Sequence, residues 1–230
     1  MMLTNAINRF FKPFIFTMVL CFSSSNILGN DLPDNHSEAL ANLLSRSAYF
    51  QADFKQVIRD ADGEVIDQAV GDVWLSRPSK LRWDITEPLE QTLIVSDDQF
   101  FQYDQDIDQL IIEPLSDQLS AMPVLLLSGD ASAINKQFIV KQIKAVTAPS
   151  GDAKLPGSQK ILFTLKPLAR DGLFQLLTLE FVDEKLQAIA ILDDLEQSSR
   201  FEFSAINVDD IIDDAQFELV PPEYTDIIYR

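Results

Sequence analysis

Few residues in this sequence could act as an acid, a base or a nucleophile at neutral pH. The chain has one histidine, His36, which lies away from every other motif, and a Ser-His-Asp site would require it as the base. The single cysteine is Cys21, near the N-terminus. The seven glycines form neither a G-x-S-x-G segment nor a phosphate-binding loop. We therefore predict no catalytic residue, no metal site and no cofactor.

Carboxylates are the remaining candidates, because the chain has 36 acidic residues against 18 basic ones. Adjacent acids stand at Asp193-Asp194, Asp209-Asp210 and Asp213-Asp214. A pair of carboxylates can hydrolyse glycosides, but no pair stands out in so acidic a chain, and a periplasmic hydrolase is the weak alternative. The run from Asp104 to Asp108 resembles the start of a calcium loop, although Gln109 replaces its Gly and Leu115 its bidentate Glu. We interpret this run as a hairpin tip.

The first thirty residues have the pattern of a secretory leader. Residues 1–12 contain Arg9 and Lys12 and no acid, and the apolar stretch from Pro13 to Phe22 follows before small and polar residues. We expect a signal peptide over residues 1–29, with cleavage between 25 and 31, and a single domain over residues 30–230. The apolar stretch is too short for a permanent membrane anchor.

Cysteine and charge limit the possible partners further. Residues 18–20, just before Cys21, are not the small residues that a lipid-attachment site needs, so we expect no lipid anchor. Without Arg9 and Lys12 the chain has 16 basic and 36 acidic residues, a net charge of −20. Such a surface disfavours nucleic acid, and we expect a monomer stabilised by its core.

Alternating apolar and polar residues predict an antiparallel sheet. Leu81, Trp83 and Ile85 alternate with polar neighbours, which is typical of a strand with one buried face. Further strands or hairpins are expected at residues 50–58, 65–75, 93–95, 100–104, 109–115, 138–147, 160–166, 174–182, 186–192, 199–205 and 217–220. About eleven strands must curl to cover their apolar face.

Only short helices are available to cover the sheet. One begins after Asn35, which forms a capping box with Glu38 and precedes apolar residues at helical spacing. Others are expected at 123–127 and 131–135, and residues 148–159 are expected to form a loop. The expected fold is a mostly β (α+β), curved and incompletely closed antiparallel β-barrel with a lid of short α-helices.

An ordered set of motifs adds a family resemblance. The chain reads F-x-A-D-F-x-Q from Phe50, G-D-x-W-x-x-R-P-x-x-x-R-W from Gly71, I-V-S-D from Ile94 and then Tyr103-Asp104, and ends with Phe217-Glu218-Leu219 and Pro221-Pro222. These motifs resemble the periplasmic outer-membrane lipoprotein carrier proteins, the LolA family. Leu81 stands where the family often has Phe, and Asp98 where it usually has a turn Gly, which Asp can replace.

The resemblance implies a function for the apolar face. It implies a periplasmic chaperone that takes acylated lipoproteins from an inner-membrane ABC transporter to an outer-membrane receptor, with acyl chains in a hydrophobic cavity. The lipid-anchored receptor, which has the same fold, remains the alternative. The expected cavity residues are Phe50, Phe54, Trp74, Leu81, Trp83, Leu93, Val95, Phe163, Phe181 and Phe201; composition alone would assign these to an ordinary core.

Arg77 is the one polar residue to which we assign a role. It follows a predicted strand and precedes Pro78, so its five donors could bind carbonyl groups at the ends of lid helices. The Arg of this R-P motif closes the lid in the family that the chain resembles. Without the resemblance, Arg77 would be an ordinary solvated residue at a strand end.

Overall fold

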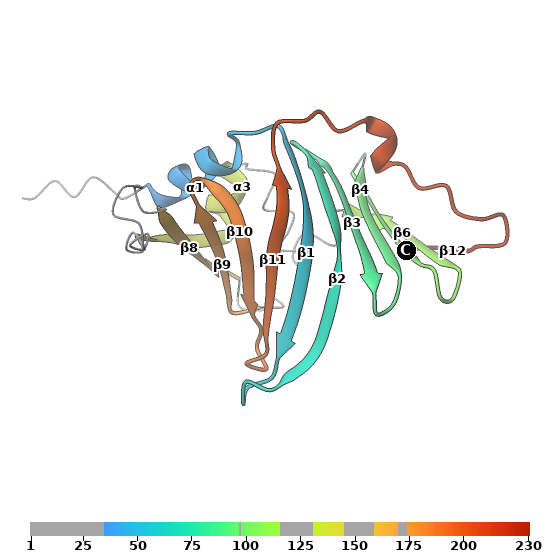
Figure 1. Cartoon of the computed structure of the whole chain (residues 1–230), viewed down its shortest axis with the longest axis horizontal. Coiled ribbons are helices and arrows are strands. Elements are labelled where there is room, and N and C mark those ends of the chain that lie inside the picture. Colours follow the sequence, from blue (N-terminus) through green and yellow to red (C-terminus); the bar gives the residue numbers. More distant parts are fainter. Residues whose placement is uncertain (1–34, 97, 116–130, 145–158, 170–173) are drawn as a thin grey trace, which may run out of the picture. The chain divides into compact units, whose positions relative to one another are not determined.

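The computed structural model describes residues 35–96, 98–115, 131–144, 159–169 and 174–230. Most of them form one large, curved, open sheet (Figure 1). Its strand order is β12-β6-β5-β4-β3-β2-β1-β11-β10-β9-β8-β7. The expected curved, incompletely closed and mostly β fold is confirmed: eleven of the twelve strands in the described residues lie at predicted positions, and β12 is additional. The additional strand, β12, pairs parallel with β6, whereas the other neighbours pair antiparallel.

The strand bounds follow the alternation closely. The strands are β1 (Tyr49–Arg59), β2 (Val65–Ser76), β3 (Lys80–Glu87), β4 (Gln91–Ser96), β5 (Gln99–Asp104), β6 (Gln109–Pro114), β7 (Phe138–Lys144), β8 (Lys160–Pro167), β9 (Leu176–Val182), β10 (Lys185–Leu192), β11 (Ser198–Asn207) and β12 (Asp226–Tyr229). The run from Asp104 to Asp108 is the β5–β6 hairpin tip, as predicted. The helix expected at 123–127 and the loop at 148–158 lie outside the described residues.

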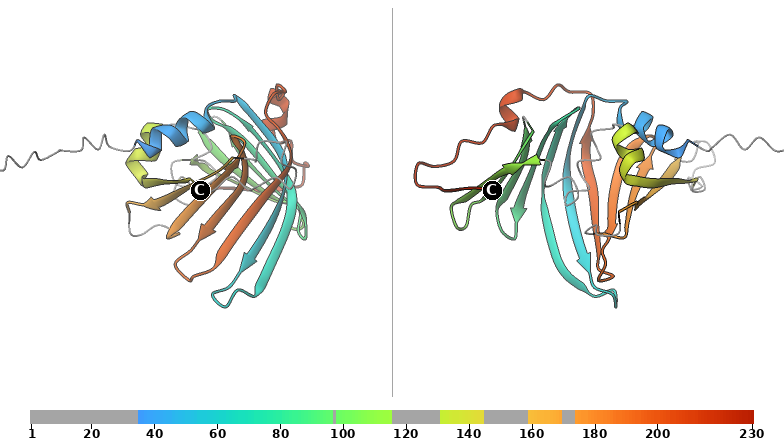
Figure 2. Two further views of the ribbon diagram at one scale, coloured as in Figure 1. Left: turned by 60° about the vertical axis from the view of Figure 1, so that its left-hand side comes forward. Right: turned by 180° about the vertical axis from the view of Figure 1, so that it is seen from behind.

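Among the described residues, the helices α1 and α3 cover one end of the sheet. Helix α1 (His36–Leu44) begins at Asn35, whose side chain accepts a hydrogen bond from the Glu38 backbone at 3.3 Å. Leu40 and Leu44 of α1 are at most 3% exposed. Helix α3 (Ala131–Gln137) lies beside α1, and both contact β7 (Figures 1 and 2). The spacing of the buried α1 residues therefore turns one face of the helix toward the core.

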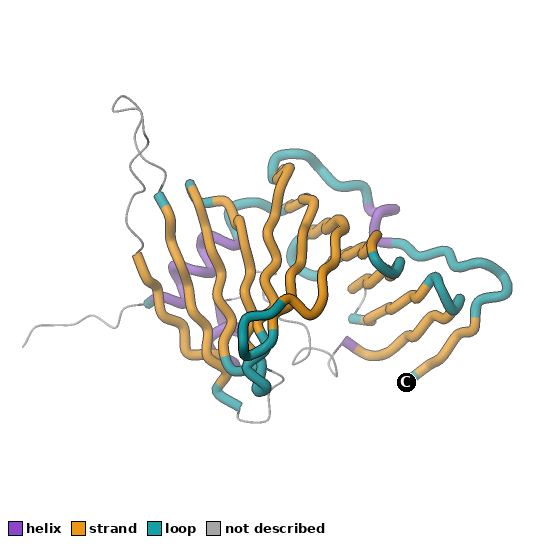
Figure 3. Tube along the Cα trace, turned by 60° about the horizontal axis from the view of Figure 1, so that its bottom comes forward, coloured by secondary structure: helices purple, strands orange, loops and turns teal. Residues whose placement is uncertain are grey.

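The two faces of the sheet differ in character. We call the face whose apolar side chains join those of α1 in one core the inner face. Residues of β1–β5 and β7–β11 contribute to this core. The opposite, outer face has the alternate residues of each strand. Figure 3 shows how the strands curve around the inner face.

The C-terminal segment covers part of the outer face. Its 3-10 helix η2 (Asp214–Phe217) lies over β3 and β4. Arg82 of β3 donates to the Gln216 carbonyl at 3.2 Å, and Phe217 is only 3% exposed. The strand predicted at 217–220 was therefore wrong: the apolar Phe217 packs onto the sheet from η2 instead of pairing within it.

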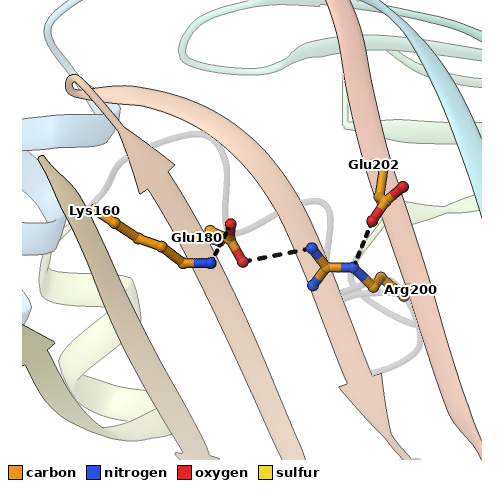
Figure 4. A network of polar contacts seen from close by, with 4 residues as sticks. All are labelled: Lys160, Glu180, Arg200 and Glu202. Atoms are coloured by element: carbon orange, nitrogen blue, oxygen red, sulfur yellow. Dashed lines mark hydrogen bonds and ion pairs between the residues drawn. The ribbon is translucent and has the colours of Figure 1, made fainter. Parts of the chain in front are cut away.

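A ladder of charged side chains crosses the outer face of β8–β11 (Figure 4). Lys160 contacts Glu180 at 2.6 Å, Arg200 contacts Glu180 at 3.4 Å, and Arg200 also contacts Glu202 at 2.9 Å. Strand β10 lies between Arg200 and Glu180, and its residue opposite Glu180 is the small Ala188. Because Ala188 leaves space above β10, the arginine can reach across a whole strand.

We expect Glu180→Gln to destabilise the protein by about 1 kcal/mol, because Glu180 bridges two cations and its side chain is only 14% exposed. The loss should shrink in about 1 M NaCl, where exposed charges are screened. Thermal melts at low and high salt measure it. The control Glu202→Gln, at a side chain 62% exposed, should lose less. Equal losses in both variants, independent of salt, would contradict the ladder's role.

Candidate functional site

Five aromatic rings pack together on the inner face. Phe54 lies 4.4 Å from Trp83 and 6.1 Å from Phe201, measured between ring centroids. Phe50 lies 5.4 Å from Phe203, and Trp83 contacts both Phe201, at 5.3 Å, and Phe203, at 6.3 Å. These distances are typical of interacting rings. We call these five residues the aromatic cluster.

The aromatic cluster also reveals how strongly the sheet curves. Trp83 is on β3 and Phe201 on β11, with β2 and β1 between them. Three strand spacings would separate these positions by about 14 Å in a flat sheet. Since the rings nevertheless touch, the sheet bends sharply around the inner face, and any guest there must displace or slide past these rings.

The other predicted inner-face residues divide into two groups. Leu81, Val95, Phe163 and Phe181 are at most 2% exposed and belong to the same core, and Leu93 packs against it partly buried. Phe163 and Phe181 meet edge to face at 5.9 Å. The structure thus gathers nine of the ten predicted residues on one apolar face.

Trp74 is the exception. Its neighbours in β2, Val73 and Leu75, are at most 4% exposed in the core. Because side chains alternate along a strand, Trp74 lies on the outer face, where its register partner is Arg82. Placing Trp74 among the cavity residues was therefore wrong, since aromatic character alone does not fix which face a residue occupies.

Sequence reasoning also missed inner-face residues. Phe203 is 5% exposed and belongs to the aromatic cluster. It stands two positions after Phe201, so strand alternation from Phe201 would have found it. Val73 is fully buried in β2. It stands two positions before the apolar Leu75, so strand alternation places the two residues on the same face.

Arg77 fastens the connection between α1 and β1. Its guanidinium donates to the Ser47 carbonyl at 2.7 Å, and its backbone N–H donates to the Ala48 carbonyl at 2.8 Å. Both acceptors lie just past Leu44, the last residue of α1. We call Arg77, Ser47 and Ala48 the latch. The contacted carbonyls thus belong to the segment that follows the helix, and not to its last turn.

Other contacts hold the same segment. The Ser47 hydroxyl binds the Val208 carbonyl, and Arg46 pairs with Glu184 of the β9–β10 turn. Beside the latch lies a pocket of about 70 Å³, lined by residues that include Leu44 and Phe181. Cavities that hold small ligands usually exceed about 300 Å³, so this pocket alone is too small for an acyl chain.

Burial affects the charge of the latch. It lowers the pKa of Arg77 to about 10 by disfavouring the charged form. Arg77 therefore stays protonated at neutral pH, at a cost in desolvation that the hydrogen bond to Ser47 offsets. A charged group held in this way resists motion of the segment, because opening would break its hydrogen bond to Ser47.

At least one acid of each adjacent pair has a structural role. Asp193 accepts hydrogen bonds from two backbone N–H groups of its turn, and Asp213 caps η2. Asp210 binds the Asn207 side chain, and Asp214 pairs with Lys80 at 2.8 Å. Within the described part of the chain, no three His, Cys, Asp or Glu side chains gather as metal ligands. No helix in the described ranges is long and apolar enough to cross a membrane.

A row of three carboxylates crosses the outer face. Asp72 lies opposite Asp53 in β1 and Asp84 in β3. Burial, followed by the negative charge of Asp53, raises the pKa of Asp72. When folding raises the pKa of an acid, the associated stability is present at low pH and is lost as the pH rises through the raised value.

We expect Asp72→Asn to stabilise the protein at pH 7 by up to about 1 kcal/mol, because it removes like charges that face each other across strands. The gain in stability should vanish below the ordinary aspartate pKa of 3.8, where Asp72 is protonated in both the folded and the unfolded protein. Thermal melts between pH 3 and 8 measure it. The control Asp67→Asn removes one charge elsewhere on β2 and should not reproduce the pH profile; a matching profile would contradict the local cause.

Comparisons with known proteins agree on one family. The family model described as "Outer membrane lipoprotein carrier protein LolA" matches residues 45–220. Outer-membrane lipoprotein carrier proteins are similar to the chain: that of Chromohalobacter salexigens is 33% identical over 192 residues, covering 84% of this chain and 86% of its own. That of Hahella chejuensis is 35% identical over 191 residues, covering 83% and 87%.

A solved structure is similar in fold. The crystal structure of an uncharacterized conserved protein from Thermus thermophilus superposes with a TM-score of 0.54 at 12% identity, covering 84% of this chain and 99% of that one. At such low identity, the likeness concerns the fold alone. It indicates that very different sequences can form a similar fold.

Proposed function

The chain belongs to the outer membrane lipoprotein carrier family, and from this premise we propose that it is a periplasmic chaperone for acylated lipoproteins. It accepts lipoproteins from an inner-membrane ABC transporter and delivers them to an outer-membrane receptor, as a monomer and without catalysis. Residues 1–29 form its signal peptide, and residues 30–230 form the single mature domain. The acyl chains bind at the inner face of the sheet.

One observation supports this proposal above the others: an extensive apolar inner face lies under helices, and a polar latch fastens the segment that follows α1. Its rings and aliphatic side chains come from strands across most of the sheet. The helix α1 packs on the core through apolar contacts, whereas the segment after it is fastened by Arg77. Apolar guests could replace the contacts of α1, and opening would break the latch.

Binding energies explain why opening a carrier must cost free energy. Complete burial of a sixteen-carbon acyl chain contributes roughly 12 kcal/mol, at about 0.8 kcal/mol per CH₂. Three such chains would exceed the practical ceiling of about 20 kcal/mol for non-covalent complexes. A carrier that held them in a perfect cavity would not release them. Displacing the aromatic cluster and breaking the latch both reduce the net affinity.

The test is a release assay on spheroplasts. Purified mature protein is added to spheroplasts that have a compatible transporter, and a triacylated lipoprotein is measured in the supernatant. Release proportional to the added protein is expected. If folded protein releases nothing while a known carrier of this family releases lipoprotein from the same spheroplasts, the carrier function is wrong.

Mass spectrometry of the mature N-terminus separates the carrier from the lipid-anchored receptor of the same fold. A carrier begins between residues 26 and 31 and has no lipid. An acylated Cys21 at the N-terminus would instead assign the chain to the receptor, which stays on the membrane.

A further inference from the structure

Four hairpin turns lie along the same edge of the sheet. In an antiparallel sheet successive turns alternate between the two edges formed by the ends of the strands. The β1–β2, β3–β4, β5–β6 and β10–β11 turns therefore share one such edge. They point toward the lower side in Figure 1, and that side faces forward in Figure 3. We call these turns, together with the strand residues that flank them, the tip rim; it comprises residues 60–66, 87–90, 104–108 and 193–197.

Three turns of the tip rim expose a large aliphatic side chain, and the first turn is followed by the exposed Ile66 near the start of β2. Ile66 is 50% exposed, Leu89 65%, Ile107 63% and Leu195 73%. A single exposed aliphatic residue is normal on a protein surface. Leu89, Ile107 and Leu195 are different, because they lie in turns, which favour Gly, Asp, Asn and Pro and do not need aliphatic residues.

The opposite edge provides the comparison. Its described turn residues are 77–79, 98 and 183–184, which read Arg-Pro-Ser, Asp and Asp-Glu. None of these is Leu, Ile, Val or Met. Among the described turn residues, the exposed aliphatic side chains therefore lie on one edge of the sheet.

Charge distinguishes the tip rim as well. Its four turns contain three, two, three and three acidic residues, eleven in all, and no Lys or Arg. Some acids shape the turns: Asp60, Asp104 and Asp193 each accept hydrogen bonds from backbone N–H groups of their own turn. These bonds fix three of the four turns, including those that carry Ile107 and Leu195.

From this pattern we infer that the tip rim is a docking surface for a basic protein surface with apolar recesses, on a membrane partner of the carrier. The inference rests on the proposed function, which requires contact with membrane proteins at both ends of the route. Acidic tips attract Lys and Arg of a partner and speed its encounter. Phospholipid surfaces are anionic and repel the same tips, so lipid is not the expected occupant.

The experiment measures binding of fluorescently labelled mature protein to spheroplasts, in low salt and in about 0.3 M NaCl. An aliphatic variant combines Leu89→Ser, Ile107→Ser and Leu195→Ser. A charge variant combines Asp62→Asn, Asp106→Asn and Glu196→Gln, acids that are not the turn-shaping ones. The matched control combines Ile139→Ser, Ile143→Ser and Ile211→Ser, which are exposed aliphatic residues outside the tip rim. Thermal melts verify that all variants fold.

We expect both tip-rim variants to bind spheroplasts at least about tenfold more weakly than the wild type. The control should stay within about twofold, and salt should weaken wild-type binding more than binding of the charge variant. Spheroplasts stripped of exposed protein by trypsin should lose wild-type binding. Wild-type affinity in either tip-rim variant would overturn the inference, as would tip-rim-dependent binding to protein-free liposomes made from the same lipids.

Two further readouts separate this inference from the proposed function. Binding of a fluorescent fatty acid reports on the inner face, and lipoprotein release reports on the carrier function. A wild type that does neither refutes the carrier function itself. If the wild type does both and the tip-rim variants release lipoprotein equally well, only the docking inference is wrong.

Discussion

Replacing Gly71 by alanine is expected to lower the free energy of unfolding by at least about 3 kcal/mol, among the largest effects of a single methyl group. A Cβ at Gly71 would lie 1.9 Å from the Asp84 carbonyl oxygen and 2.9 Å from the Phe54 ring. Neither neighbour can yield cheaply, because the first is backbone of β3 and the second belongs to the aromatic cluster. Denaturant unfolding followed by tryptophan fluorescence measures the loss.

Gly63→Ala is the matched control, since it adds the same methyl group where space is open. Gly63 lies in the β1–β2 turn with φ +85°, and no heavy atom lies within 4 Å of the place that a Cβ would occupy. Its cost should be only the left-handed backbone strain, about 1–2 kcal/mol. If both variants lose the same stability, the close approach of β2 and β3 at Gly71 is not what requires glycine there.

Arg77→Leu is expected to slow transfer of bound lipoprotein to receptor-containing membranes at least about tenfold, while release from spheroplasts continues. A hydrogen bond to a charged group contributes about 1.5–3 kcal/mol, and the variant loses the one to Ser47. Without that cost of opening, the loaded state becomes more stable and the acyl chains are held more tightly. The rate of transfer from preloaded protein measures the effect.

Arg46→Leu is the control for this variant. Arg46 belongs to the same connecting segment, but its ion pair with Glu184 is about half exposed and should contribute less than about 1 kcal/mol. Transfer by this variant should stay within about threefold of the wild type. If Arg46→Leu retains cargo as strongly as Arg77→Leu, the latch has no special role.

Local patterns predicted much of this fold. Alternation in β3 and the Asn35–Glu38 cap needed only near neighbours, and both appear in the structure. Trp74 was misplaced because apolar residues occupy both faces here: Ile94, on the outer face of β4, is only 1% exposed. Ile94 is buried on the outer face because η2, which contains Phe217, packs over β3 and β4 on that side.

The rest depended on distant contacts. Strand β12 was missed because its partner, β6, lies more than one hundred residues earlier in the chain, and no local periodicity reports such a pairing. Arg77 could be singled out from its motif, but the acceptor Ser47 could not, because a backbone carbonyl leaves no trace in residue type. The packing of the aromatic cluster likewise depends on sheet curvature, which strand patterns do not encode.

The central pairing of the sheet has a consequence for how the chain acquires its structure. Strands β1 and β11 are neighbours at the middle of the sheet, yet Arg59 and its partner Ser198 are 139 positions apart. Contacts between such distant residues form slowly. The two halves of the sheet therefore cannot join until nearly the whole polypeptide is present. For a chain that is exported as proposed above, completing the fold this late would keep the polypeptide unfolded during export.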